Sequence, residues 1–346
     1  MPAKHRGKRA KNRGDPFSPY SANRNRNRMS NAIKLQVIAD ESGSRIDRLL
    51  LKHFPQLNFV AVQKLLRTGQ VRLDGKRVKP GDRVEEGQEI RLPPFLQKLA
   101  SGDKKEGQTG VIPKSVQEKF KSHIIYDDDC IVVLNKWSGL AVQGGSKTNI
   151  HVDAISAAVY DRKLKLVHRL DKDTSGVLLL AKTGKAAGHL TRAFAEQETD
   201  KVYLAITYGI PNPKSGIINL PLAKRLSKDM EKIEVDHDEG DEAITEYRTI
   251  QSHPSGYSLV ELKPITGRTH QLRVHCEAKG MPILGDPKYG DAPTEIDGLK
   301  GPLLLHLHAQ RITFPHPDLG PITMRAPLPD HFEKTMQFFG FSIKFE

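Results

Sequence analysis

From about residue 120 onwards, short apolar runs rich in β-branched residues recur along the chain. We predict strands in four of these runs, at residues 131–134, 176–181, 202–208 and 258–262. Stretches with helical patterning separate some of them, at residues 150–160 and 186–198. Such a mixture predicts an α/β or α+β domain over residues 118–346, and we favour α+β with a mixed, mostly antiparallel sheet.

A smaller α+β unit is predicted before this domain, over residues 44–93. Apolar residues follow a helical spacing at residues 45–54 and again at 59–67, where the expected apolar stripe consists of Phe59, Val62, Leu65 and Leu66. Gly69 is expected to cap the second helix. A hairpin turning at Asp74-Gly75 and a strand at residues 87–92 complete the unit.

Positive charge is concentrated in the first quarter of the chain. The net charge is +13, of which residues from 94 onwards contribute only +1. Residues 1–31 are basic and poor in apolar side chains, so we expect a disordered tail, and residues 94–117 are expected to be a linker. This distribution fits a polyanion-binding front end on a nearly neutral body, although basic residues also aid solubility.

Several other classes of protein and site fit the sequence poorly. No apolar run reaches membrane-spanning length, and we expect a soluble, cytoplasmic protein without a membrane partner. Cys130 and Cys276 are too few for a disulfide framework or a zinc ribbon. His306 and His308 have a spacing compatible with a metal, but further ligands are lacking nearby, so we predict no metal. The acidic segment 229–242 lacks calcium-loop spacing and is expected to be a solvated excursion.

The stretch LVHRLDKDTSGVLLLA, residues 166–181, places Asp171 in a polar turn between two apolar strands. A carboxylate in such a turn is accessible to a ligand, but it also suits a turn-capping role, which the pattern alone favours by about two to one. Asp171 and Asp173 also match the D-x-D pair of haloacid dehalogenase-type phosphotransferases. Against that alternative, Gly176 leads directly into a strand and no convincing partner acids for Mg²⁺ are found.

HRLDKDTSGVLLLAK resembles the signature of the pseudouridine synthases that modify large-subunit ribosomal RNA and transfer RNA. Four further segments match the family's motifs in order, at residues 131–139, 201–205, 266–286 and 307–317. The segment LLRTGQVRLDGKRV within residues 44–93 resembles the S4 RNA-binding domain. The combination most closely resembles the C type of the large-subunit synthases. Trp137 and Gln143 depart from the family's usual Pro and His, outside the catalytic motifs.

The resemblance implies an isomerase that breaks the C1′–N1 bond of uridine, turns the uracil and joins C5 to C1′, without a cofactor. Asp171 is the implied nucleophile or stabiliser at the sugar, and Tyr203 is expected to stack on the uracil. Arg273 is the expected cation that keeps Asp171 ionised, on a helix predicted at residues 269–279 with Thr269 as N-cap. Arg169 is expected to fill the gap left by the flipped-out uridine.

Large-subunit ribosomal RNA, or its assembly precursor, is the implied partner of a monomeric protein. Basic residues of the second helix and the hairpin are expected to bind it: Lys64, Arg67, Arg72, Lys76 and Arg77. His168 is expected to hold its turn, and His270 and His275 to serve helix packing or RNA contacts. A non-catalytic, ribosome-associated S4-type protein is the alternative, although binding alone would not require the catalytic motifs.

Overall fold

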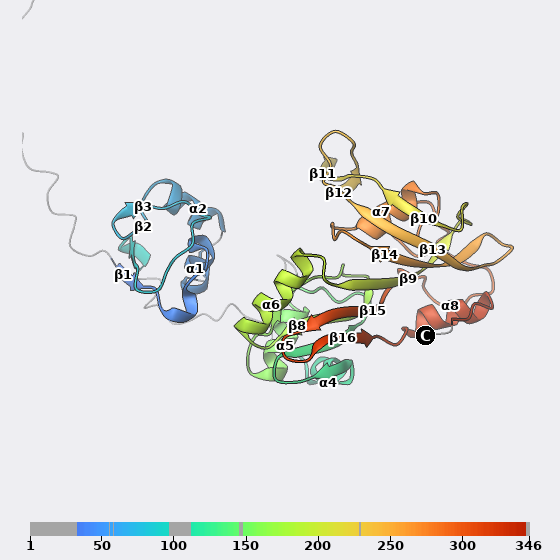
Figure 1. Ribbon diagram of the computed structural model, residues 1–346, viewed down its shortest axis with the longest axis horizontal. Coiled ribbons are helices and arrows are strands. Elements are labelled where there is room, and N and C mark those ends of the chain that lie inside the picture. The colour runs from blue at the N-terminus through green and yellow to red at the C-terminus, as the bar shows by residue number, and fades with distance from the viewer. Residues whose placement is uncertain are drawn as a thin grey trace, which may run out of the picture. The chain divides into compact units, whose positions relative to one another are not determined.

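The structure is a computed structural model that describes residues 33–96, apart from 55 and 58, and residues 112–343, apart from 145–147 and 228–229. The chain divides into two compact units, Met1–Gln108 and Thr109–Glu346 (Figure 1). The tail predicted at residues 1–31 lies outside the described residues, as does most of the predicted linker. No helix among the described residues is long and apolar enough to cross a membrane.

In the N-terminal unit, two helices and a four-stranded antiparallel sheet share one hydrophobic core. Its elements are β1 (Ile33–Gln36), η1 (Ala39–Glu41), α1 (Ile46–His53), α2 (Phe59–Arg67), β2 (Arg72–Leu73), β3 (Lys76–Arg77) and β4 (Glu89–Leu92). The hairpin turns at Asp74 and Gly75, which both have positive φ, as this type of turn requires. Strand β1 precedes the expected start at residue 44 and joins the sheet because Ile33 and Leu35 pack on the core.

The second helix departs from its expected apolar stripe at one position. Val62, Leu65 and Leu66 are buried, whereas Phe59 is 53% exposed. Phe59 is the first residue of α2 and lies ahead of the turns that face the core, so its assignment to the stripe was wrong. Gly69 follows the helix with a φ of 69°, a conformation that glycine adopts without strain.

The C-terminal unit is built on a ten-stranded sheet, as counted over the described residues, with the order β10-β13-β14-β9-β15-β8-β6-β5, β16 beside β15 and β7 beside β8. Among these strands only β8 and β15 pair in parallel, which confirms a mixed, mostly antiparallel sheet. Its strands are β5 (Ile124–Asp127), β6 (Ile131–Lys136), β7 (Lys165–Leu166), β8 (Ser175–Ala181), β9 (Asp200–Tyr208), β10 (Ser215–Asn219), β13 (Ile244–Ser252), β14 (Tyr257–Pro264), β15 (Leu307–His316) and β16 (Gly320–Arg325).

Helices cover both faces of this sheet: α4 (Lys114–Ser122), α5 (Val152–Tyr160), α6 (Gly184–Ala195), α7 (Gln271–Ala278) and α8 (Asp330–Phe338). Every residue of β8 is buried, because Leu178 packs on the side of α5 and Leu179 on the side of α6. Around β9 and β14, α7 contributes to one core and α8 to another. Figure 1 shows α5 and α6 beside β8, and α7 beside β10 and β13.

Two observed elements fall within segments that we expected to be irregular. Helix α4 begins at Lys114, inside the predicted linker. Strands β11 (Leu222–Ser227) and β12 (Met230–Val235) pair as a hairpin, and β12 lies in the segment predicted as a solvated excursion. The hairpin is not simply solvated, since Ile233 and Val235 pack against a buried cluster around Tyr289.

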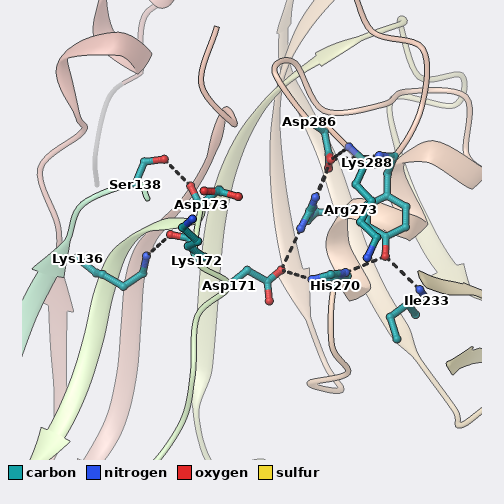
Figure 2. Close-up of polar contacts among 11 residues, drawn as sticks. Lys136, Ser138, Asp171, Lys172, Asp173, Ile233, His270, Arg273, Asp286 and Lys288 are labelled. Atoms are coloured by element: carbon teal, nitrogen blue, oxygen red, sulfur yellow. Dashed lines mark hydrogen bonds and ion pairs between the residues drawn. The ribbon is translucent and has the colours of Figure 1, made fainter. Parts of the chain in front are cut away.

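The loop between β7 and β8 is fixed from beneath by a buried lysine (Figure 2). Lys136 ends β6 and is fully buried. Its Nζ donates hydrogen bonds of 3.2, 2.9 and 2.8 Å to the carbonyl oxygens of Trp137, Leu140 and Lys172. Burial lowers the pKa of Lys136 to about 7, against the charges of Asp173 and Asp171. The ammonium group therefore depends on these carbonyl groups to offset its desolvation.

The residues that follow Lys136 form further hydrogen bonds to the same loop. Gly139 N donates to the carbonyl oxygen of Lys172 at 3.0 Å, and Ser138 Oγ donates to that of Asp173 at 2.8 Å. Just beyond the loop, Gly176 has a φ of 109°, and a Cβ there would lie 2.2 Å from the carbonyl oxygen of Ala309 in β15. Only glycine allows β8 to start so close to β15.

Replacing Lys136 by Met tests this anchor. The substitution keeps most of the side-chain volume but removes three hydrogen bonds, and of the three carbonyl groups those of Lys172 and Trp137 keep a backbone donor, from Gly139 and Leu140. A buried carbonyl group that is left unsatisfied costs about 1–3 kcal/mol. We expect the free energy of unfolding of the C-terminal unit to fall by roughly 3 kcal/mol, as measured by calorimetry of the whole chain. Lys172→Met is the control, because that side chain is exposed in the same loop. Equal unfolding temperatures for the two variants would contradict the anchoring role.

Candidate active site

A pocket of about 420 Å³ lies beside the β7–β8 loop. Its walls come from that loop, the end of α6, the start of β9 and the segment that leads from β14 into α7. This volume lies within the range typical of small-molecule sites. The four residues predicted for catalysis and base flipping all line it: Arg169, Asp171, Tyr203 and Arg273. The fold therefore brings together side chains from three distant parts of the sequence.

The Asp171 carboxylate faces two basic side chains across the pocket (Figure 2). Its Oδ2 lies 3.7 Å from Arg273 Nη1 and 3.8 Å from His270 Nε2. The carboxylate is 17% exposed, so it is reachable from the pocket yet largely shielded from water. At such distances in a largely buried site, water screens the attraction between a carboxylate and a cation only weakly.

Arg273 is held mainly by a second carboxylate. Its Nε and Nη2 both donate to Asp286 at 2.7 Å, in a bidentate pair whose side chains are only 5% and 1% exposed. Burial lowers the pKa of Arg273, but the bonds and charge of Asp286 outweigh it, and the pKa lies above its ordinary value. Asp286 uses both oxygens in this pair, which leaves Nη1 of Arg273 directed at Asp171.

Helix α7 starts later than its predicted range. It begins at Gln271, and its N-cap is His270 rather than Thr269, without a capping hydrogen bond from the side chain. The chain turns here because Gln271 is bonded to the preceding loop: Gln271 Oε1 accepts hydrogen bonds from Arg268 N and Thr266 Oγ1. His270 consequently has left-handed backbone, with a φ of 54°, and its ring enters the pocket.

Tyr203 reaches the pocket from β9. Burial raises the pKa of its hydroxyl far above the ordinary value, and the charge of Asp171 adds to the shift. The phenol therefore stays protonated at every physiological pH. It can offer a ring face to a planar base and a neutral O–H group, but not a phenolate.

Two other histidines near these elements have structural roles. His168 is stacked on Phe194 at 4.6 Å, and its Nε2 accepts a hydrogen bond from Leu179 N at 2.8 Å, so it holds the turn as predicted. Burial lowers its pKa to about 3. His275 is buried, bonded to Thr245 Oγ1 and to a backbone carbonyl, which is the helix-packing role. His270, by contrast, is neither a helix residue nor part of the helix packing.

His306 and His308 are both buried between other elements. His306 Nε2 is bonded to Thr335 Oγ1 at 2.9 Å, and His308 Nδ1 to Ser175 Oγ at 2.8 Å. Burial lowers the pKa of each to about 4. Among the residues that the structure describes, no group of three or more His, Cys, Asp or Glu side chains is arranged to hold a metal ion.

The five basic residues predicted to bind RNA lie on one part of the N-terminal unit, at the end of α2 and on the β2–β3 hairpin: Lys64, Arg67, Arg72, Lys76 and Arg77. All are exposed except Arg72, which is half-buried and donates to the carbonyl oxygen of Gly75. Within the described ranges none of the five forms an ion pair with an acidic side chain. Their charges therefore remain available to a polyanion.

Sequence reasoning overlooked two supports of the site. Asp286 lies in a segment that already matched a family motif, and a lone acid after the run MPILG was the available signal. Lys136 could have been noticed as a charged residue that closes a strongly apolar strand. In both cases the sequence gives the residue but not its partner, which comes from a distant part of the chain.

Comparison with known families supplies two matches. Residues 130–278 match the model of the RNA pseudouridylate synthase family, and residues 44–90 match that of the S4 domain. The first range contains the pocket residues of the β7–β8 loop, β9 and α7. The phosphotransferase alternative is thereby set aside.

Individual relatives extend over nearly the whole chain. The ribosomal large subunit pseudouridine synthase C of Vibrio vulnificus is 36% identical over 315 residues, covering 88% of this chain and 96% of the relative. The protein of the same name from Escherichia coli K12 is 35% identical with the same coverage. The relatives therefore span both units of this protein.

Among solved structures, human RNA pseudouridylate synthase domain containing 4 superposes with a TM-score of 0.55 at 29% identity, covering 66% of this chain and 97% of its own. The human domain containing 1 protein gives 0.51 at 27% identity, over 61% and 86%. Sequence, motif order and fold agree, and the chain belongs to the RNA pseudouridylate synthase family, with an S4 domain at its N-terminal side.

Proposed function

We propose that this pseudouridine synthase converts specific uridines of large-subunit (23S) ribosomal RNA, in the cytoplasm, with Asp171 as the catalytic carboxylate. One observation carries the proposal: Asp171 lines a pocket of about 420 Å³ opposite Arg273, a buried cation 3.7 Å away, and Tyr203 lines the same pocket. The relatives named as large-subunit synthases support the choice of RNA. The expected monomeric state stays a prediction.

The reaction needs a nucleoside that has left its helix. Arg169 is exposed and lines the pocket two residues before Asp171, where it can occupy the space that the flipped-out uridine leaves. The extruded uracil then stacks on Tyr203. The carboxylate acts at the sugar while the C1′–N1 bond breaks, the base turns, and a C1′–C5 bond forms. The proton lost from C5 is balanced by the one gained at N1, so no cofactor is consumed.

In this scheme Arg273 has an electrostatic role. Its Nη1 favours ionised Asp171, and Asp286 prevents the guanidinium from swinging away. The S4 unit has a separate role, because its five basic side chains supply affinity for phosphates without reaching into the chemistry. Binding and catalysis are therefore expected to respond to different substitutions.

Replacing Asp171 by Asn tests the catalytic carboxylate. The amide keeps the shape but cannot act as a nucleophile or carry negative charge, so we expect pseudouridine formation to fall by about 10³-fold or more. RNA affinity should change by less than about threefold, since phosphate contacts dominate affinity. Single-turnover assays and binding titrations on one ribosomal RNA fragment measure both. Asp200→Asn, which removes a carboxylate outside the pocket, is the control. If Asp171→Asn keeps a rate within about tenfold of wild type, the assignment of Asp171 as the catalytic carboxylate is refuted.

Replacing Arg273 separates its charge from its geometry. Arg273→Met leaves buried Asp286 without its cation, which costs about 3–5 kcal/mol of stability, and the acidic limb of the rate–pH profile should move to higher pH because ionised Asp171 loses a nearby cation. Arg273→Lys keeps the charge but not the two-pronged bond, and should retain more activity.

The control for this pair is Arg311→Met, which removes a partly exposed ion pair with Asp200. It should cost no more than about 1 kcal/mol and leave the pH profile in place. An unshifted acidic limb together with weaker RNA binding in Arg273→Met would show that Arg273 binds a phosphate instead.

Neutralising the five basic residues of the S4 unit tests its electrostatic role. With all five replaced by Gln, we expect weaker RNA binding and a smaller slope of log Kd against log salt. The slope should fall by roughly 3.5, at about 0.7 for each phosphate that is no longer neutralised. The rate at saturating RNA should be retained. The control carries five Gln substitutions at exposed lysines of the C-terminal unit: Lys114, Lys121, Lys185, Lys300 and Lys334. Equal slopes in the two variants would contradict the proposal.

A further inference from the structure

We propose that His270 is a positioning residue for Asp171, held by Tyr289 in the tautomer that carries its proton on Nε2, so that this N–H group faces the carboxylate. The inference rests on the proposed role of Asp171. It assigns His270 a part in the site, although the sequence indicated only helix packing or RNA contacts for it.

A chain of polar contacts links the β11–β12 hairpin to Asp171. Ile233 N, in β12, donates a hydrogen bond to the hydroxyl of Tyr289 at 3.2 Å. The same hydroxyl lies 2.7 Å from His270 Nδ1. On the other side of the ring, His270 Nε2 lies 3.8 Å from Asp171 Oδ2. Figure 2 shows the His270 ring between Asp171 and the strand that carries Ile233.

The hydrogen bond from Ile233 N to the Tyr289 hydroxyl favours one tautomer of His270. The Tyr289 hydroxyl accepts from a backbone N–H group, and its own proton then has a well-placed acceptor in Nδ1 of His270. The imidazole proton is consequently on Nε2, the atom that faces Asp171. The opposite tautomer would direct a nitrogen lone pair at a carboxylate and leave the tyrosine proton without its short hydrogen bond.

The surroundings keep the imidazole neutral. Burial lowers the pKa of His270, and the charges of Arg273 and Lys288 lower it further, whereas Asp171 and Asp286 oppose the shift. At neutral pH the ring therefore has one proton, whose place is set by Tyr289. The ionisable groups that face His270 from the neighbouring elements are Asp171, Arg273, Asp286, Lys288 and Tyr289.

Rigid supports hold both ends of the ring. Tyr289 is 1% exposed, and the guanidinium of Arg273 lies over its ring at 4.9 Å from the centroid. His270 itself has left-handed backbone, which is uncommon outside glycine but is adopted by Asn, Asp and His more often than by other residues, and its Nε2 lies 3.8 Å from Asp171 Oδ2. A distance of 3.8 Å needs only a small movement of the carboxylate to become a hydrogen bond when a base fills the pocket.

The first test reads the tautomer directly. We would record ¹⁵N NMR spectra of histidine-labelled full-length protein and assign His270 by its loss in His270→Gln. The expected signals are those of a neutral ring with the proton on Nε2, and Tyr289→Phe should change the tautomer ratio. Tyr247→Phe is the matched control, because its buried hydroxyl donates to the carbonyl oxygen of Pro213. A ring protonated on Nδ1 in the wild type would overturn the proposal.

The second test uses single-turnover rates and their pH dependence. Loss of a hydrogen bond to a charged group should slow His270→Leu by roughly 10- to 100-fold and move the acidic limb to higher pH by about one unit. His270→Gln should recover part of the rate, since its amide N–H group can occupy the place of Nε2. In the His270→Leu background, Tyr289→Phe should cause little further loss of rate, because the Tyr289 hydroxyl is proposed to act on Asp171 only through His270.

These outcomes are distinct from a failure of the proposed function. If Asp171→Asn is active, the role of Asp171 is wrong, and His270 has no carboxylate to position. If Asp171→Asn is inactive but His270→Leu keeps the wild-type rate and pH profile, only the present inference fails. Additive effects of His270→Leu and Tyr289→Phe, with no rescue by Gln, would likewise overturn it.

Discussion

The buried ion pair between Arg273 and Asp286 is the interaction on which the site depends. Two carboxylates share one guanidinium: Asp286 binds it through both oxygens, and Asp171 lies 3.7 Å from the remaining nitrogen. Without Asp286, the buried Arg273 would have Asp171 as its closest carboxylate partner. In the proposed reaction, a direct bond of that kind would occupy an oxygen of Asp171 that is needed at the sugar. The pair keeps the cation near Asp171 and also leaves that oxygen accessible.

The loop that carries Asp171 is held by hydrogen bonds to its own backbone and by close packing of β8 on β15. Lys136 binds the carbonyl oxygen of Lys172, and Gly176 permits β8 to begin against β15. The loop is thus fixed to the most deeply buried strands of the sheet. Across the pocket, His270 and Arg273 both contact Tyr289: His270 through the tyrosine hydroxyl and Arg273 through the face of its ring. The two basic side chains that face Asp171 therefore pack on the same residue. If Asp171 is the catalytic group, as proposed, supports on both sides mean that little ordering remains to be done when substrate binds.

In the proposed function, the S4 unit binds RNA and the C-terminal unit carries out the chemistry. The S4 unit presents five basic side chains that form no ion pair within the described part of the chain, whereas Arg273, the cation beside Asp171, is buried and paired with Asp286. Affinity for RNA can therefore come from exposed charge without disturbing the balanced charges near Asp171. One contact links the β11–β12 hairpin of the C-terminal unit to the pocket. Ile233 N, in the partly exposed strand β12, donates a hydrogen bond to the hydroxyl of Tyr289.

Local sequence determined much of this protein: four strands of the large sheet (β6, β8, β9 and β14), the α2 helix, the turn at Asp74-Gly75, and the motif around Asp171. These features depend on side-chain periodicity and turn chemistry, which act between near neighbours. Only the tertiary structure decided three contacts of the site. Asp286 binds Arg273, Lys136 binds the loop that carries Asp171, and the ring of His270, the N-cap of α7, faces Asp171. Each of these rests on a contact between residues from different strands or loops, with burial making an unpaired charge costly. The periodicity of the sequence contains no information about such partners. They are determined by which charged and polar groups the folded chain buries next to one another.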